Sequence, residues 1–180
     1  MLMEFNNGKI AGMDTCMKSG IGSYAIQIGE LKIGAVVAVN ALGDIYDWKT
    51  GKKIAGLLTE DKQGFRDTLE YMAKDISSKD KFTGNTTIGV IITNASFEKS
   101  QLCKIAGMAH DGYARSIRPV HTTADGDSIY AVSAGTVAAD QDLVGSFAAL
   151  VMSEAINRAV ISAETAYGFV SASDLAGRDG

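Results

Sequence analysis

Two apolar runs constrain the fold of this chain more than any other feature of its sequence. Residues 32–41 and 86–93 carry apolar side chains on both faces of an extended strand. Strands of this kind are typical of sheets covered on both sides. Amphipathic segments follow each run, and helices that alternate with such strands predict a layered α/β sandwich.

Three segments show the apolar spacing of amphipathic helices, at residues 61–77, 97–118 and 141–167. Thr59 is the candidate N-cap of the first, Pro119 ends the second and Gly168 ends the third. Short strands are expected at 45–48 and 128–134. With 180 residues, the chain is predicted to form one domain, residues 1–180.

Composition excludes several classes of function. The net charge of −4 comes without a basic block, so neither nucleic acid nor a membrane surface is expected as a partner. The apolar run at 33–39 is far too short to cross a membrane, and the first five residues do not resemble a signal peptide, which predicts a cytoplasmic protein. Cys16 and Cys103 lack the spacing of a zinc ribbon or a disulfide framework and are expected to be reduced.

The segment Gly84-Asn85-Thr86-Thr87 places two hydroxyls at the start of the second apolar run. A threonine there can attack the carbonyl before it, and cleavage between Asn85 and Thr86 would leave a Thr86 α-amine that serves as the base. The alternative is that two β-branched residues only favour a strand edge. Thr87 is the weaker candidate because alternation places it on the opposite face.

A second polar segment, His121-Thr122-Thr123-Ala124-Asp125-Gly126-Asp127, precedes the strand at 128–134. Its two carboxylates could be turn formers, a solvated patch or a weak cation site. Metal binding needs more oxygen ligands, so no metal or other cofactor is expected. His110 and His121 suggest a Ser-His-Asp arrangement, but we favour a structural role in which they bind backbone near the site.

Asn40 ends the first apolar run, where an amide side chain needs a partner or forms a turn. Lys9 and Lys18 are the lysines that could lie near such a site, and the spacing to Asn40 favours Lys9. A solvated surface lysine is the alternative for both. Gly8-Lys9 lacks the second upstream glycine of a phosphate-binding loop.

These segments, together with Val39-Asn40-Ala41-x-Gly43-Asp44, resemble the P1 family of peptidases (peptidase family S58) over residues 8–175. The group contains L-aminopeptidase/D-esterases, β-peptidyl aminopeptidases and nylon-oligomer endohydrolases. The resemblance implies a layered αββα-type sandwich shared with ornithine acetyltransferase. It also implies a self-processing N-terminal-nucleophile hydrolase of small peptides or amino-acid amides, cut into an α-subunit-like part (1–85) and a β-subunit-like part (86–180) and assembled as a homo-oligomer.

Carried onto this chain, the resemblance makes Thr86 the nucleophile and Asn85-Thr86 the scissile bond. Asp125 and Asp127 would orient the Thr86 amine and hydroxyl, Asn40 would donate to the oxyanion, and Lys9 would lie near the site.

One departure from the family is large, because its members carry a long portion before the segment that begins at Gly8. Without it, the strand at 32–41 should have open edges and an uncovered apolar face. The alternative function is therefore a truncated, inactive relative that acts as a folding or interaction module. The substrate is left open.

Overall fold

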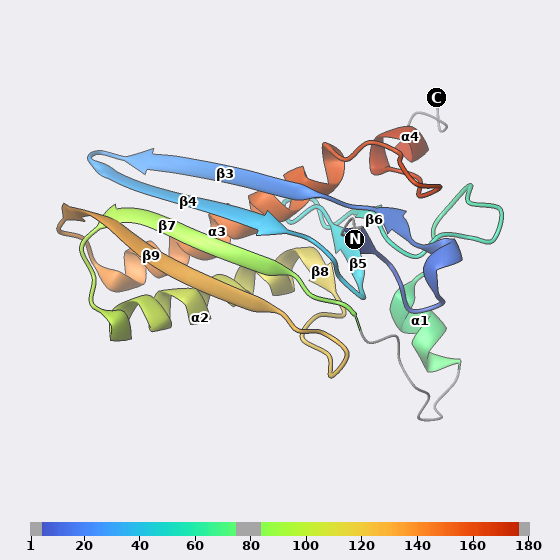
Figure 1. Ribbon diagram of the computed structural model, residues 1–180, viewed down its shortest axis with the longest axis horizontal. Helices are drawn as coiled ribbons and strands as arrows, with labels where there is room; N and C mark the ends of the chain where they lie inside the picture. Colours follow the sequence, from blue (N-terminus) through green and yellow to red (C-terminus); the bar gives the residue numbers. More distant parts are fainter. Residues whose placement is uncertain (1–4, 75–83, 177–180) are drawn as a thin grey trace.

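The computed structural model describes residues 5–74 and 84–176. Its centre is a four-stranded sheet with the order β3-β4-β7-β9 (Figure 1), made of β3 (Ile21–Ile28), β4 (Leu31–Ala38), β7 (Ile88–Ala95) and β9 (Ser128–Val137). The first three strands are antiparallel, while β7 and β9 are parallel. Parallel neighbours need a crossover connection, which α2 (Lys99–Ser116) supplies.

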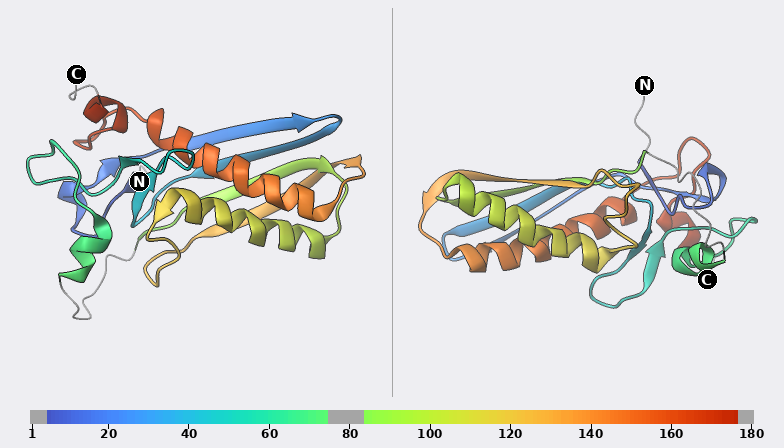
Figure 2. Two further views of the ribbon diagram at one scale, coloured as in Figure 1. Left: turned by 180° about the vertical axis from the view of Figure 1, so that it is seen from behind. Right: turned by 90° about the horizontal axis from the view of Figure 1, so that it is seen from below.

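One face of this sheet is covered by α2 and α3 (Gln141–Ile161), as Figure 2 shows. By length and composition α3 could cross a membrane, but 67% of its most apolar window is buried inside the protein, as expected of a core helix. The core lies between the two layers. Its members include Ile33, Val37 and Ile91 from the sheet, Ile105, Ala109 and Tyr113 from α2, and Val151, Met152 and Ile156 from α3.

Glycines let α3 approach the sheet and let the two helices approach each other. A Cβ on Gly22 of β3 would lie 2.0 Å from the carbonyl oxygen of Ala155 in α3, and one on Gly112 of α2 would lie 2.6 Å from that of Ala149 in α3. A Cβ on Gly89 of β7 would lie 2.9 Å from the Tyr113 hydroxyl. At Gly22 and Gly112 a side chain is excluded because helix backbone already occupies the space.

Smaller elements gather at one end of the sheet. They are the pair β1 (Asn6–Asn7) and β2 (Met17–Lys18), the sheet β6-β5-β8 (Lys53–Ala55, Asp44–Tyr46, Ile117–Arg118), the short helix η1 (Met13–Thr15), α1 (Thr68–Ala73) and α4 (Ala172–Ala176). Buried Asp44 joins three of these segments: its carboxylate accepts from the Leu57 amide at 2.8 Å, the Thr68 hydroxyl at 2.7 Å and the Lys53 ammonium at 2.7 Å.

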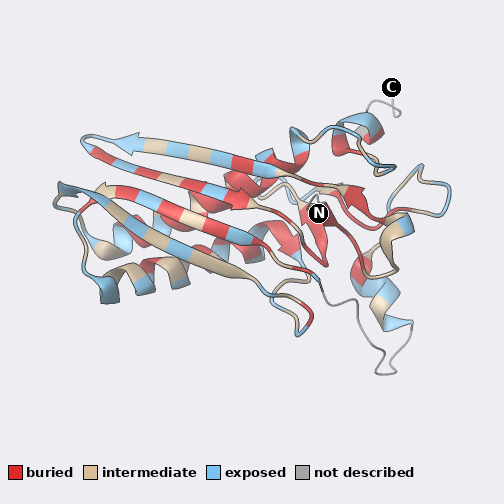
Figure 3. Cartoon of the chain, in the orientation of Figure 1, coloured by how far each residue is buried: buried red, intermediate tan, exposed pale blue. Residues whose placement is uncertain are grey.

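The other face of the central sheet is uncovered in the described residues, as the alternating colours of β4 and β7 in Figure 3 show. Its exposed apolar side chains are Val36, Ile88, Ile92, Tyr130 and Val132. The prediction that 32–41 and 86–93 are buried on both sides was therefore wrong, because an apolar pattern does not report whether a covering layer is present. The expectation of an uncovered apolar face is confirmed. The expectation of open edges at 32–41 is wrong, because β4 pairs with β3 on one side and with β7 on the other.

Several predicted boundaries also change. The helix expected at 61–77 is only α1, because Asp67 caps it by accepting from the Leu69 and Glu70 amides, and Leu69 is 55% exposed rather than buried. Thr59 instead forms a turn, donating its hydroxyl to Asp61 at 2.5 Å. Residues 75–77 lie outside the described residues.

The remaining elements are close to their predictions. The expected helix at 97–118 is confirmed as α2, the strand at 128–134 extends to Val137, and the helix at 141–167 ends at Ile161 with Ser162 as its C-cap. The short strand at 45–48 is β5, which pairs with β6 and β8 rather than with β4.

Candidate active site

The candidate residues converge where three strands of the central sheet meet at one end. Asn40 follows the end of β4, Thr86 precedes β7, and Asp127 precedes β9. Because β4 runs antiparallel to β7 and β9 runs parallel to it, one strand end and two strand starts share this edge. Residues distant in sequence therefore meet here.

The bond between Asn85 and Thr86 has two donors on its carbonyl oxygen. The Thr86 hydroxyl donates to the Asn85 carbonyl oxygen at 2.6 Å, and the Gly126 amide donates to the same atom at 2.8 Å. The Thr86 amide in turn donates to the Asn40 carbonyl at 2.9 Å. A hydroxyl, a carbonyl and a backbone N–H in this arrangement are the groups that an intramolecular acyl shift requires.

Asn40 links this bond to a buried lysine. Its Nδ2 donates to the Gly84 carbonyl at 2.8 Å, while its Oδ1 accepts from Lys9 Nζ at 2.8 Å and from the Asn6 amide at 3.3 Å. Lys9 Nζ also lies 3.3 Å from the Asn40 carbonyl oxygen. These bonds fix the orientation of the Asn40 amide, so that its donor atom faces the chain just before the candidate scissile bond.

Lys9 is only 2% exposed, which is rare for a lysine. Burial lowers its pKa from 10.5 to about 8, and the nearby Cys16 and Asp125 oppose that change. Lys18, the other candidate, donates instead to the carbonyls of Phe5 and Ser19. Of the two lysines, the structure thus brings Lys9 to Asn40.

The two aspartates serve different segments in the uncleaved chain. Asp127 Oδ1 accepts from the Thr87 amide at 2.9 Å, whereas Asp125 Oδ2 accepts from the Thr122 amide at 3.0 Å and its hydroxyl at 2.7 Å. Within the described residues, neither carboxylate makes a hydrogen bond to Thr86. Burial raises the pKa of the Asp127 carboxyl, and the Thr87 N–H bond opposes this effect.

Thr86 and Thr87 differ in burial, as the alternation of side chains along a strand predicts. Thr87 is fully buried, and Thr86 is partly accessible. Among residues 5–74 and 84–176, no group of three or more His, Cys, Asp or Glu side chains could hold a metal ion.

Sequence reasoning missed two contributors to the site. Gly126 was treated as a spacer between aspartates, yet its N–H binds the Asn85 carbonyl, and a Cβ there would lie 2.8 Å from the Thr86 hydroxyl oxygen. Tyr113 lies in the helix expected at 97–118 and was not considered as a site residue, although its hydroxyl donates to the Thr87 carbonyl at 3.1 Å. A tyrosine in an otherwise aliphatic stripe was the available signal, because a buried hydroxyl needs a partner.

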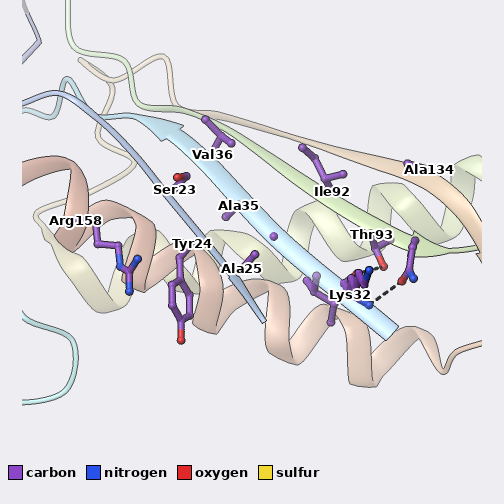
Figure 4. Close-up of a pocket in the computed structure, with 13 residues that line it drawn as sticks. Ser23, Tyr24, Ala25, Lys32, Ala35, Val36, Ile92, Thr93, Ala134 and Arg158 are labelled. Carbon is purple, nitrogen blue, oxygen red and sulfur yellow. Dashed lines mark hydrogen bonds between the residues drawn. The ribbon is translucent and has the colours of Figure 1, made fainter. Parts of the chain in front are cut away.

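A groove of about 550 Å³ lies elsewhere, on the β3, β4 and β7 part of the sheet (Figure 4). Its lining includes Ser23, Val36, Ile92 and Ala134, with Lys32 and Arg158 as the charged side chains. It contains no carboxylate and none of the residues around Thr86. The candidate catalytic groups therefore lie at the strand ends, and the groove is a separate feature of the uncovered sheet face.

Comparisons with known proteins place the chain beside one family of peptidases. A family model described as peptidase family S58 matches residues 6–173. An uncharacterized aminopeptidase of Mycobacterium tuberculosis is 32% identical over 181 residues, covering 88% of this chain and 52% of the relative. A 6-aminohexanoate-oligomer endohydrolase of Paenarthrobacter ureafaciens is 32% identical over 136 residues, covering 73% of this chain and 37% of the relative. The chain thus spans about half or less of the length of these relatives.

Two solved structures have a similar fold. The L-aminopeptidase D-Ala-esterase/amidase of Ochrobactrum anthropi, described as a variant of the Ntn hydrolase fold, has a TM-score of 0.57 and 22% identity over 87% of this chain and 45% of its own. A β-aminopeptidase of a Burkholderia species has a TM-score of 0.53 and 18% identity over 89% of this chain and 48% of its own. This chain, with one helical layer on one central sheet, therefore has part of the fold of these two enzymes.

Proposed function

Because the chain belongs to peptidase family S58, we propose that it is a self-processing N-terminal-nucleophile amide hydrolase in which Thr86 is the nucleophile. The observation that carries this proposal is the Asn85 carbonyl oxygen, which lies between the Thr86 hydroxyl and the Gly126 amide. These two contacts support Thr86 as the nucleophile and the Gly126 amide as a donor to the oxyanion.

Processing would begin with attack of Thr86 Oγ1 on the Asn85 carbonyl carbon. The new C–O bond moves a pair of electrons onto the carbonyl oxygen, which the Gly126 N–H stabilises. Collapse breaks the C–N bond, and the Thr86 nitrogen leaves with the proton of the hydroxyl. Water then hydrolyses the resulting ester, which leaves an Asn85 carboxylate and a free Thr86 amine.

The freed amine would serve as the base for its own hydroxyl in turnover. Asn40 Nδ2, which binds the Gly84 carbonyl in the intact chain, would become available to a substrate carbonyl once residues 84–85 withdraw. Its Oδ1 stays held by Lys9, so the donor is pre-oriented. The relatives named as aminopeptidase and oligomer endohydrolase support small peptides or amino-acid amides as substrates.

The two pieces are expected to remain associated. β4 precedes the cut and β7 follows it, and the two strands pair from Ile33 with Thr93 to Ala38 with Ile88. We also propose, from the family, a cytoplasmic homo-oligomer.

Intact-mass measurement of the purified protein tests the proposal. Cleavage should give pieces of 85 and 95 residues from the 180-residue chain. Thr86→Ala should stay at full mass, whereas Thr86→Ser, which keeps a hydroxyl, should still be cut. Turnover of an aminoacyl p-nitroanilide then tests hydrolysis. A folded parent that stays at full mass would favour the inactive module instead.

A further inference from the structure

The peptide group that follows the nucleophile is held from both sides. Asp127 Oδ1 accepts from the Thr87 amide, and the Tyr113 hydroxyl donates to the Thr87 carbonyl. Tyr113 also lies 3.3 Å from the Ser128 carbonyl, so it joins the starts of β7 and β9. The position of Thr86 therefore depends on how firmly the Asp127 carboxylate is held.

The second oxygen of that carboxylate meets a histidine. His121 Nδ1 lies 2.9 Å from Asp127 Oδ2, and the Asp127 side chain is only 5% exposed. His121 Nε2 lies 3.3 Å from His110 Nδ1, and the His121 ring stacks on Tyr113 with centroids 5.8 Å apart and planes at 24°. His121 thus contacts the carboxylate, and His110 and Tyr113 contact the His121 ring.

The backbone of His121 is unusual as well. Its φ of 55° lies in the left-handed region, which costs free energy for a residue other than glycine. The ring contacts and the bond to Asp127 hold it there. Such a conformation at the edge of a candidate site is consistent with a residue whose side chain must point in one direction.

We propose that His121 is a positioning residue that donates Nδ1–H to Asp127 Oδ2, and that His110 fixes this tautomer by donating Nδ1–H to His121 Nε2. The Asp127 carboxylate then presents Oδ1 to the Thr87 amide, which sets the place of Thr86. The inference deepens the proposed function and rests on it.

The surrounding charges fit this role. Burial raises the pKa of the Asp127 carboxyl, Asp125 adds to that increase, and the Thr87 N–H and His121 oppose it. Burial, and to a smaller extent His121, lowers the pKa of His110, whereas Asp127 and Asp111 act to raise it. Tyr113 is a neutral phenol beside Asp127, because burial raises its pKa above the ordinary value of a tyrosine. A donor from His121 therefore opposes the effect of burial on the Asp127 carboxyl.

The test compares His121→Ala, His121→Asn and His121→Gln. Asn tolerates the left-handed backbone and carries an N–H near the position of Nδ1, whereas Gln carries its N–H nearer that of Nε2. Self-cleavage should slow about tenfold to a hundredfold in the Ala and Gln variants, with the acid limb of the pH profile moved upward, and recover in the Asn variant. Lys104→Gln, at an exposed position of helix α2, which carries His110 and Tyr113, is the control.

A second measurement does not require activity. In the uncleaved Thr86→Ala background, carbon NMR of the Asp127 carboxyl should show a higher pKa with Ala or Gln at 121 and a value nearer the parent with Asn. Proton NMR should show that the pKa of His110 rises when His121 is replaced. An Asp127 pKa that is the same in all folded variants would overturn the inference. A parent that never cleaves would overturn the proposed function while these titrations still decide the role of His121.

Discussion

Replacing Lys9 by Met should change how the stability of the protein depends on pH. In the folded chain, burial lowers the pKa of Lys9 from 10.5 to about 8. Each pKa unit corresponds to about 1.4 kcal/mol, so the folded state pays about 3 kcal/mol to keep this ammonium charged. Below about pH 8 the whole cost is present, because Lys9 is protonated in both the folded and the unfolded state.

The sign of the effect follows from proton binding. As pH rises from about 8 to 10.5, folded Lys9 loses its proton while unfolded Lys9 keeps it. The unfolded state then binds more protons, so stability rises with pH. The free energy of unfolding of the parent minus that of Lys9→Met should increase by about 3 kcal/mol across this window.

The measurement is urea unfolding followed by circular dichroism at several pH values, with every chain carrying Thr86→Ala so that cleavage does not intervene. Titrating groups that do not interact with Lys9 cancel in the difference. Lys52→Met, at an exposed position, is the matched control. A flat difference for Lys9→Met would refute the argument that this ammonium is buried.

Three further outcomes are expected. Gly126→Ala should slow self-cleavage strongly with little change in stability, because its Cβ would meet the Thr86 hydroxyl; intact mass over time checks this, and cleavage at the parental rate would contradict it. Asp127→Asn should lower both self-cleavage and amide turnover. It should also become more stable relative to the parent as pH rises above 3.8, because burial disfavours the ionised carboxylate of the parent. A urea-unfolding series in which the parent becomes relatively more stable as pH rises would count against this. Asp44→Ala should destabilise the fold by about 3 to 5 kcal/mol, because Lys53 loses its buried partner; thermal unfolding measures this, and a loss below about 1 kcal/mol would show that the pair is not needed.

The uncovered sheet face leads to one more expectation. The protein alone should bind a hydrophobic dye and self-associate through the exposed apolar side chains of β4, β7 and β9. Tyr130→Lys, at a position that is 61% exposed, should reduce both effects without unfolding the chain. A monomer that does not bind the dye would show that this face is not available as an interaction surface.

The sequence predicted the elements whose patterns are local. The amphipathic pattern of α2 needed no tertiary information, but the helix ends at Ser116, and residues 117–118 form β8 before Pro119. Thr86, Asn40 and Lys9 were chosen from local residue patterns together with the resemblance to peptidase family S58. The helix expected at 61–77 failed because Asp44, distant in sequence, binds Thr68, and Asp67 begins the helix beside it. The contact between His121 and Asp127 depends on a loop conformation that no apolar pattern encodes.

The close approach of the helices to the sheet has a consequence for how this protein can vary. At Gly22 and Gly112 a side chain would meet helix backbone, so these positions should tolerate almost no substitution although neither of them reacts. At Gly89 a side chain would meet the Met152 side chain and the Tyr113 hydroxyl, so it would disturb the contact of Tyr113 with Thr87. Gly89 leaves the room through which the Tyr113 hydroxyl reaches Thr87. A mutational scan should therefore find intolerant positions along the interior of the layers, and an engineer seeking new substrates should keep these three glycines fixed and vary the surface around Asn40 instead.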